Sequence, residues 1–176
     1  MDKHENTPMI TGTFPDQNAA ERAYNDLMKK GYTEKDVHVL MSEDTRKHLH
    51  GADNFKIEHG NKALEGAGAG GALGGAVGAT ILGVMAAAST VAIPGIGLVV
   101  AGPLAGALIG GAAGAAAGGL AGTFVGMGIP EDRAKEFESD VKHGSIVMGV
   151  NPRTDEDARY FENEWKNTGQ HVYRSA

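Results

Sequence analysis

The chain contains no cysteine, which excludes disulfide bonds, thiolate chemistry and cysteine-based zinc sites. Basic clusters are also missing: no run of Lys or Arg exceeds two neighbours, and the formal net charge is -6. Because nucleic-acid-binding proteins usually carry a basic patch or stripe, we expect no nucleic-acid partner. The polar N-terminus is not followed by an apolar core with a cleavage site, so we expect no secretory signal.

Charge is absent from one long internal stretch. From Gly66 to Pro130 the sequence has no Asp, Glu, Lys, Arg or His, whereas both flanks are dense in charge, and the 27 glycines are concentrated in this stretch. The composition therefore predicts three parts. Residues 1–62 and 129–176 are expected to form the two halves of one α+β domain, with residues 63–128 as an apolar insertion.

The N-terminal flank has the pattern of a β-α-β unit. A short apolar run over 9–14 predicts a strand. Asp16 can cap a following helix, whose apolar residues recur at helical spacing until Gly31 ends it. The run over 36–41 predicts a second strand.

The C-terminal flank repeats this alternation. The spacing predicts a helix over 130–144, a strand over 145–150, a helix over 154–169 and a short strand over 171–173. Thr154 heads the second helix in a capping-box pattern, where acidic residues in the first turn suit the helix dipole.

The two flanks share a register that suggests an internal repeat. Ala20, Ala23, Leu27 and Gly31 match Ala158, Phe161, Trp165 and Gly169 at identical spacing. Each half is too short to bury a stable core alone. We therefore predict a split ferredoxin-like domain, with its helices on one face of one sheet and the apolar segment inserted between its second and third strands.

Glycine recurs every fourth residue in two series inside the insertion. A step of four places each series along one face of an α-helix, and such glycine ridges let another helix approach closely. This close approach would offset the cost of glycine in a helix, about 1 kcal/mol each relative to alanine. The helix-packing and oligomerisation residues predicted from this pattern are Gly66, Gly70, Gly74, Gly78, Gly102, Gly106, Gly110, Gly114, Gly118, Gly122 and Gly126.

Between the two series, Pro94, Gly95 and Gly97 predict a helix break and a hairpin turn. The insertion is thus expected to be a long antiparallel Gly/Ala-rich α-hairpin, each arm of which can exceed the ~20 apolar residues that cross a bilayer. Three arrangements stay open: a hairpin that spans the membrane, one embedded from one side, and one buried against other copies in a soluble assembly.

No pattern for catalysis or metal binding stands out. His48-Leu49-His50 lies near His59, but an i, i+2 pair faces opposite sides of a helix, so loop histidines are the better interpretation. The run over 66–71 follows no strand and is no dinucleotide fingerprint, and neither a nucleophile elbow nor a Walker sequence occurs. We therefore predict a protein that is not an enzyme, with no cofactor, metal or identified small-molecule substrate.

The flanks resemble the bacterial general stress protein family, which includes heat- and low-temperature-induced members. The resemblance is carried by Gly12-Thr13-Phe14 with Gly31-Tyr32 in the first half, and by Gly128-Ile129-Pro130-Glu131-Asp132-Arg133-Ala134 with the 146–150 strand in the second. Longer members have a similar Gly/Ala-rich hairpin between the halves. The resemblance implies a stress-induced bacterial protein and supplies no catalytic residues.

These observations predict a non-enzymatic stress-response protein that self-associates and engages the membrane through its glycine zippers. Homo-oligomers and a lipid membrane are the expected partners. The expected location is the cytoplasmic membrane with the α+β domain on the cytoplasmic side, or otherwise the cytoplasm. The alternative is a soluble, oligomeric ligand- or protein-binding module in which the hairpin serves only for oligomerisation.

Overall fold

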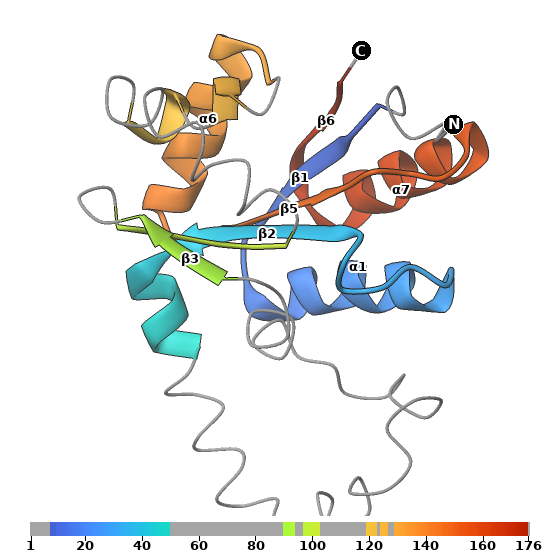
Figure 1. Ribbon diagram of the computed structural model, residues 1–176, viewed down its shortest axis with the longest axis horizontal. Helices are drawn as coiled ribbons and strands as arrows, with labels where there is room; N and C mark the ends of the chain where they lie inside the picture. Colours follow the sequence, from blue (N-terminus) through green and yellow to red (C-terminus); the bar gives the residue numbers. More distant parts are fainter. Residues whose placement is uncertain are drawn as a thin grey trace, which may run out of the picture.

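The computed structural model describes residues 8–49, 90–93, 97–102, 119–122, 124–126 and 129–175. In chain order its elements are β1 (Ile10–Phe14), α1 (Gln17–Lys29), β2 (Val37–Ser42), β3 (Thr90–Ile93), β4 (Leu98–Ala101), α6 (Glu131–Lys142), β5 (Ile146–Val150), α7 (Asp155–Thr168) and β6 (Gln170–Arg174). Residues 43–49, 119–122 and 124–126 are also helical. The fold is α+β, as the sequence predicts (Figure 1).

The strands form one antiparallel sheet in the order β3-β4-β2-β5-β1-β6. β5, from the C-terminal flank, lies between the two strands of the N-terminal flank. Its residue Met148 is opposite Gly12 of β1, and its residue Val147 is opposite Leu40 of β2. Because the central strands alternate between the flanks, the two flanks together make one domain.

Both predicted helix caps are confirmed. The carboxylate of Asp16 accepts a hydrogen bond from the Ala19 amide at 2.8 Å, at the start of α1. The hydroxyl of Thr154 accepts one from the Asp157 amide at 3.1 Å, at the start of α7. Each cap satisfies one amide that the helix cannot pair internally, a contribution of about 1 kcal/mol.

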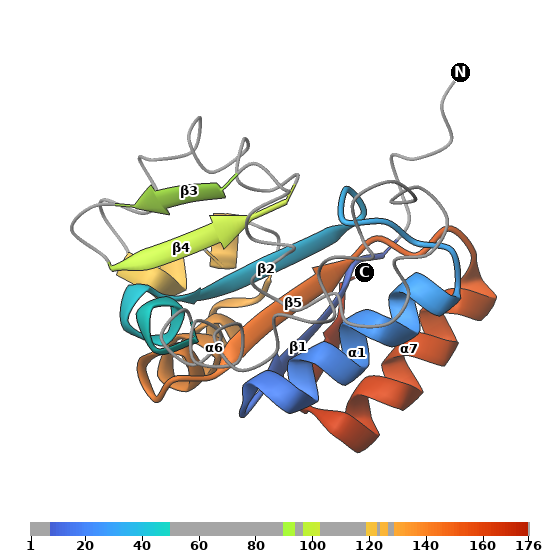
Figure 2. The same ribbon diagram turned by 90° about the horizontal axis from the view of Figure 1, so that it is seen from below.

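Helices α1 and α7 lie side by side on one face of the sheet (Figure 2). The predicted repeat describes this face, since Ala20, Ala23 and Leu27 of α1 and Ala158, Phe161 and Trp165 of α7 are all buried in the same core. Strand residues of odd or even number alternate between faces, so Val39 of β2 belongs to this core whereas Leu40 does not.

The prediction that all helices cover one face is wrong. Helix α6 packs on the opposite face, where Phe137 and Val141 join Leu40 and Val147 in a second core with the buried Phe124. Figure 1 shows α6 and α1 on opposite sides of β2. The physical reason is that β2 and β5 carry apolar residues on both faces, so each face of the sheet needs a cover.

Part of the predicted α-hairpin is a β-hairpin. Residues 90–93 and 98–101 are strands β3 and β4, which extend the sheet beyond β2 (Figure 2). They are rich in Val, Ile and Thr, and residues of this kind fit a pleated surface better than a helix. Val99 and Val100 accordingly enter the two different cores. The predicted turn residue Gly97 lies between β3 and β4, with a positive φ of 66°.

Gly102 was predicted to pack in a helix, and this is also wrong. It follows β4 with a φ of 97°, and a Cβ on it would collide with the carbonyl of Val37. Gly122 and Gly126 do lie in helical residues. The remaining predicted zipper and turn positions lie outside the described residues: Gly66, Gly70, Gly74, Gly78, Pro94, Gly95, Gly106, Gly110, Gly114 and Gly118.

Candidate functional site

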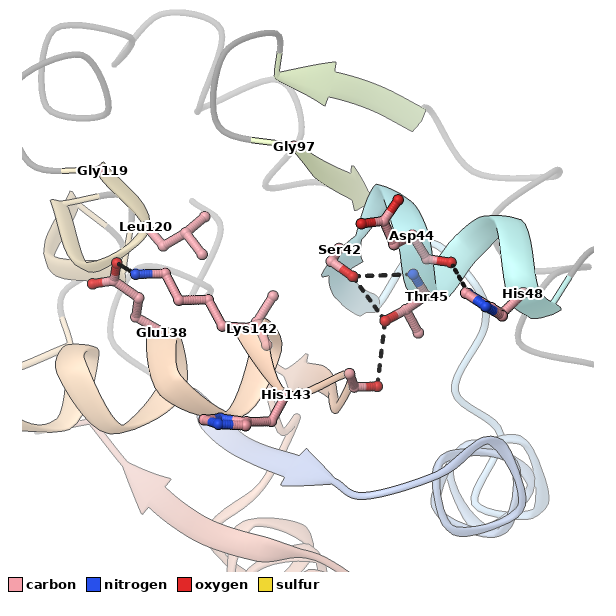
Figure 3. A pocket seen from close by; sticks show the side chains of 12 residues that line it. Ser42, Asp44, Thr45, His48, Gly97, Gly119, Leu120, Glu138, Lys142 and His143 are labelled. Atoms are coloured by element: carbon pink, nitrogen blue, oxygen red, sulfur yellow. Dashed lines mark hydrogen bonds and ion pairs between the residues drawn. The ribbon is translucent and has the colours of Figure 1, made fainter.

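A pocket of about 620 Å³ opens where β2 ends (Figure 3). Four segments line it: the start of the 43–49 helix, the turn before β4, residues 119–120, and the C-terminal end of α6. The lining residues are Ser42, Asp44, Thr45, His48, Gly97, Gly119, Leu120, Glu138, Val141, Lys142, His143 and Gly144. The pocket is thus built from both flanks and from the insertion.

The hydroxyl groups of the pocket hold its backbone segments together. Ser42 Oγ accepts a hydrogen bond from the Thr45 amide at 3.0 Å and lies 2.8 Å from Thr45 Oγ1. Thr45 Oγ1 in turn donates to the Gly144 carbonyl at 3.4 Å, and the Glu43 amide donates to the Gly97 carbonyl at 2.8 Å. These bonds tie β2, the turn before β4 and the end of α6 to one another.

The charged groups of the pocket carry both signs. On α6, Lys142 Nζ lies 2.6 Å from Glu138 Oε1, an i, i+4 pair in which the lysine is largely exposed. Exposed pairs of this kind contribute about 0.3–0.5 kcal/mol. On the opposite wall, Asp44 is exposed to solvent. Figure 3 shows the ion pair and Asp44 on different sides of the pocket.

Two histidines of the pocket have fixed tautomers. His48 Nδ1 lies 2.7 Å from the Asp44 carbonyl, and His143 Nδ1 lies 2.7 Å from the Ser139 carbonyl. A carbonyl only accepts, so Nδ1 donates in both of these exposed rings. His48 is part of the 43–49 helix, so its prediction as a loop residue is wrong. His50 and His59 lie outside the described residues.

The described part of the chain holds no group of three or more His, Asp or Glu residues that could bind a metal ion. In Figure 3 the rings of His48 and His143 lie apart from each other, on different segments. What the pocket offers is a hollow with hydroxyls engaged in backbone bonds, solvent-facing imidazoles and mixed charge. This suits weak polar binding better than a reaction that needs an activated nucleophile.

A second polar cluster joins the two flanks at the other end of the sheet. The Tyr32 hydroxyl, from the loop after α1, donates to Asp157 Oδ2 at 2.8 Å and accepts from the Arg153 amide at 2.8 Å. The Arg153 guanidinium lies 4.5 Å from the Tyr32 ring centroid and 3.0 Å from Asp36 Oδ2. We call Tyr32, Asp36, Arg153 and Asp157 the inter-flank clamp.

The electrostatics of the clamp follow from burial and charge. Burial, together with the adjacent Asp157 carboxylate, raises the pKa of Tyr32 to about 12, although Arg153 opposes the shift. Burial alone would raise the pKa of Asp36, but hydrogen bonds from Thr33 and the charge of Arg153 lower it below its ordinary value. At neutral pH the phenol of Tyr32 is therefore neutral, and the ionised Asp36 pairs with the Arg153 guanidinium.

Replacing Tyr32 with phenylalanine is expected to lower the free energy of unfolding by about 1–3 kcal/mol, because two bonded groups lose their partner. Urea unfolding at neutral pH measures the change. Tyr160→Phe is the matched control, since no hydrogen bond of its hydroxyl is seen among the described residues, and it should stay within about 0.5 kcal/mol. Equal effects of the two substitutions would show that the clamp does not stabilise the domain.

Sequence reasoning missed the clamp. Asp157 lies in the acidic first turn that was predicted only as part of the Thr154 helix cap, and Gly31-Tyr32 was named only in the family resemblance. The clamp residues are separated by up to 125 positions along the chain, so no local spacing could have joined them. The available signal was an aromatic residue placed directly after the glycine that ends α1.

Comparisons with protein-family models, with curated proteins and with solved structures give no match. Within the ranges that the structure describes, no helix combines the length and apolar character needed to cross a bilayer.

Proposed function

We propose that the chain is a non-enzymatic stress-response protein, similar to the bacterial general stress proteins, that self-associates and engages the membrane through its glycine-rich segment. Its α+β domain would then be the scaffold that holds this segment. Homo-oligomers and lipid are its partners, and the cytoplasmic membrane is its location.

The pairing of β3 with β4 carries this proposal. Thr90, the first residue of β3, is opposite Ala101, the last residue of β4. One glycine series precedes β3 and the other follows β4, so both runs join the sheet at the same end of one hairpin. Two uncharged runs that start side by side can pack through glycine ridges, within one chain or between copies.

The exposed side of residues 119–126 also supports self-association. Val125 is 45% exposed, and a Cβ on Gly126 would meet nothing within 4 Å. Gly126 continues the four-residue spacing of the series onto this open side. A second copy would cover a surface that the described residues of the same chain leave uncovered.

The finer fold proposal is a ferredoxin-like core made of β1, α1, β2, β5, α7 and β6. The strand order β2-β5-β1-β6, with α1 and α7 on one face, supports it. This is the arrangement of two split β-α-β units. In this interpretation β3 and β4 are additions that belong to the insertion. Helix α6 is an addition that connects the insertion to β5.

The double substitution Gly110→Leu/Gly114→Leu tests the proposed function. Two leucines on the glycine face should prevent close helix approach, so oligomers measured by sizing in detergent and in buffer should dissociate. Membrane retention after a carbonate wash should also fall. Ala112→Leu/Ala116→Leu places two leucines on another side of the same run and should leave both measurements close to wild type.

An unchanged oligomer and unchanged membrane partition in the Gly110→Leu/Gly114→Leu protein would count against the proposal. The second candidate function is a soluble ligand- or protein-binding module, which the 620 Å³ pocket favours. Carbonate washing of membranes from cells that express the wild-type chain separates the two. A membrane-embedded protein stays in the pellet, whereas a soluble assembly is released.

A further inference from the structure

His38 is buried on the sheet face that α1 and α7 do not cover. It is the second residue of β2, its side chain is on the same side as that of Leu40, and it is 5% exposed. Its cross-strand neighbour on β5 is Gly149, whose neighbour on β1 is Thr11. His38, Gly149 and Thr11 therefore form a row across three central strands. The imidazole lies beside Gly149, which has no side chain.

One nitrogen of the His38 ring lacks a partner. Nε2 lies 2.9 Å from Asn151 Oδ1, whereas Nδ1 is buried with no hydrogen-bond partner among the described residues. A neutral imidazole tolerates this, because one ring nitrogen carries no proton. A protonated ring must donate from both nitrogens, and a buried charged N–H without an acceptor is costly.

Little around His38 would stabilise a positive charge. In the described structure, Asp36 is the charged group that acts on the ring, and its carboxylate is already paired with Arg153 at 3.0 Å. The groups that face the ring from β5 and the residue after it are Gly149 and Asn151, neither of which ionises.

Among the described residues, the other neighbouring strands add no charge beside the ring. From β1 and the residue before it come Thr11, whose buried hydroxyl also lacks a partner in the described structure, and Met9, whose sulfur lies near Gly149. Directly after β4, the backbone of Gly102 lies close to the backbone of His38. Burial therefore outweighs the opposing effects of Asn151 and Asp36 and lowers the pKa of His38.

The strand that carries His38 also anchors the glycine-rich segment. β2 pairs with β4 from Val39 to Ser42. Directly after β4, Gly102 lies against the backbone of Val37 and His38, so closely that a Cβ has no room. The second glycine series begins at Gly102. His38 therefore lies next to the first residue of this series.

We propose that His38 is an acid-sensitive latch, in which proton uptake at Nδ1 weakens the packing of β2 and releases β3 and β4 together with the glycine-rich segment that they anchor. The release would make the segment available for self-association or lipid binding, and this consequence rests on the proposed function. The latch itself requires only the α+β domain.

The sign of the effect follows from proton binding. The unfolded or opened chain takes up a proton on His38 near its ordinary pKa of about 6.5, more readily than the closed chain does. The latch is therefore intact above that pH. As pH falls from there towards the lowered pKa of the closed state, the opening equilibrium should rise by up to about tenfold per pH unit.

Hydrogen exchange of the full chain in lipid-free buffer tests the proposal. Peptides covering β2 and β4 are followed at pH 7.5 and at pH 5.5, because the ordinary histidine pKa of ~6.5 lies between the two values. The measured rates are corrected for the pH dependence of intrinsic exchange. The wild-type chain should lose protection at the lower pH. His38→Gln, which keeps a neutral hydrogen-bonding side chain, should show the same protection at both. His48→Gln, at an exposed histidine, should behave as wild type.

A wild-type chain with equal protection at both pH values would overturn the latch, as would pH dependence that persists in His38→Gln. If that variant does not fold, an NMR titration of the wild-type ring decides, because a His38 pKa at or above about 6.5 contradicts the proposal. If the carbonate wash releases the wild-type chain from membranes, the proposed function fails but the hydrogen-exchange result is unaffected. The two proposals can therefore be overturned independently of each other.

Discussion

Trp165→Ala is expected to lower the free energy of unfolding by about 3–5 kcal/mol. The side chain is fully buried in α7, with its ring centroid 5.4 Å from that of Phe14 in an edge-to-face contact and 6.3 Å from that of Phe161. Its edge also lies over Gly12, where a Cβ would sit 3.2 Å from Cε3. Removing the indole would leave a cavity between α7 and two strands.

Trp165→Phe is the control for that substitution. The indole nitrogen is buried without a hydrogen-bond partner in the described part of the chain, so phenylalanine loses volume but no hydrogen bond. Its cost should be less than half that of Trp165→Ala. Because the chain has one tryptophan, urea unfolding must be followed by circular dichroism. Similar costs for both variants would mean that the aromatic packing around residue 165 is not what stabilises this core.

The second large effect is expected at Gly102. Gly102→Ala should lower the free energy of unfolding by about 2–5 kcal/mol, because left-handed strain and a collision with the Val37 carbonyl add together. Gly31→Ala is the matched control. Gly31 has a φ of 80°, but a Cβ there would meet nothing within 4 Å, so only the strain of about 1–2 kcal/mol applies.

Urea unfolding of both variants measures the difference, and hydrogen exchange locates it. In Gly102→Ala the loss of protection should concentrate in β4, because the collision forces β4 away from β2. In Gly31→Ala it should concentrate at the end of α1. If Gly102→Ala costs no more than Gly31→Ala, the close contact of residue 102 with β2 does not anchor the hairpin.

The sequence predicts the local structure of both flanks well because their signals are local. Asp16 and Thr154 are polar caps directly before apolar periodic runs, and each makes its predicted bond. The shared spacing of the two helices also identifies a common face, since Leu27 and Trp165 enter the same core. Such features depend on neighbours a few residues apart, which a sequence shows directly.

What the sequence did not predict depends on contacts between distant segments. Phe137 has the spacing of an amphipathic helix, but that spacing says nothing about which face of the sheet α6 will cover. Residues 90–101 were assigned to the tip of a helical hairpin because the glycine series on either side dominated the pattern. Their β-branched residues were the better guide, and pairing with β2 gave them a partner.

The candidate site shows the same contrast between local features, which the sequence reveals, and contacts between distant segments, which it does not reveal. The spacing of His48 and His50 is a local feature that the sequence shows directly, whereas the pocket around His48 brings together four segments that no motif connects. Tyr32 was named only in the family resemblance, and His38 was predicted only as a member of the strand over 36–41. Tyr32 matters because its hydroxyl bonds to Asp157 of the other flank. His38 matters because its buried Nδ1 has no hydrogen-bond partner among the described residues.

The position of β5 between β1 and β2 sets the timing of folding during synthesis. A ribosome completes both N-terminal strands and the whole glycine-rich segment before it makes the strand that must separate them. Until Ile146–Val150 emerges, β1 and β2 have apolar faces and open edges without their native neighbour. Such a nascent chain is prone to aggregation while translation is still under way.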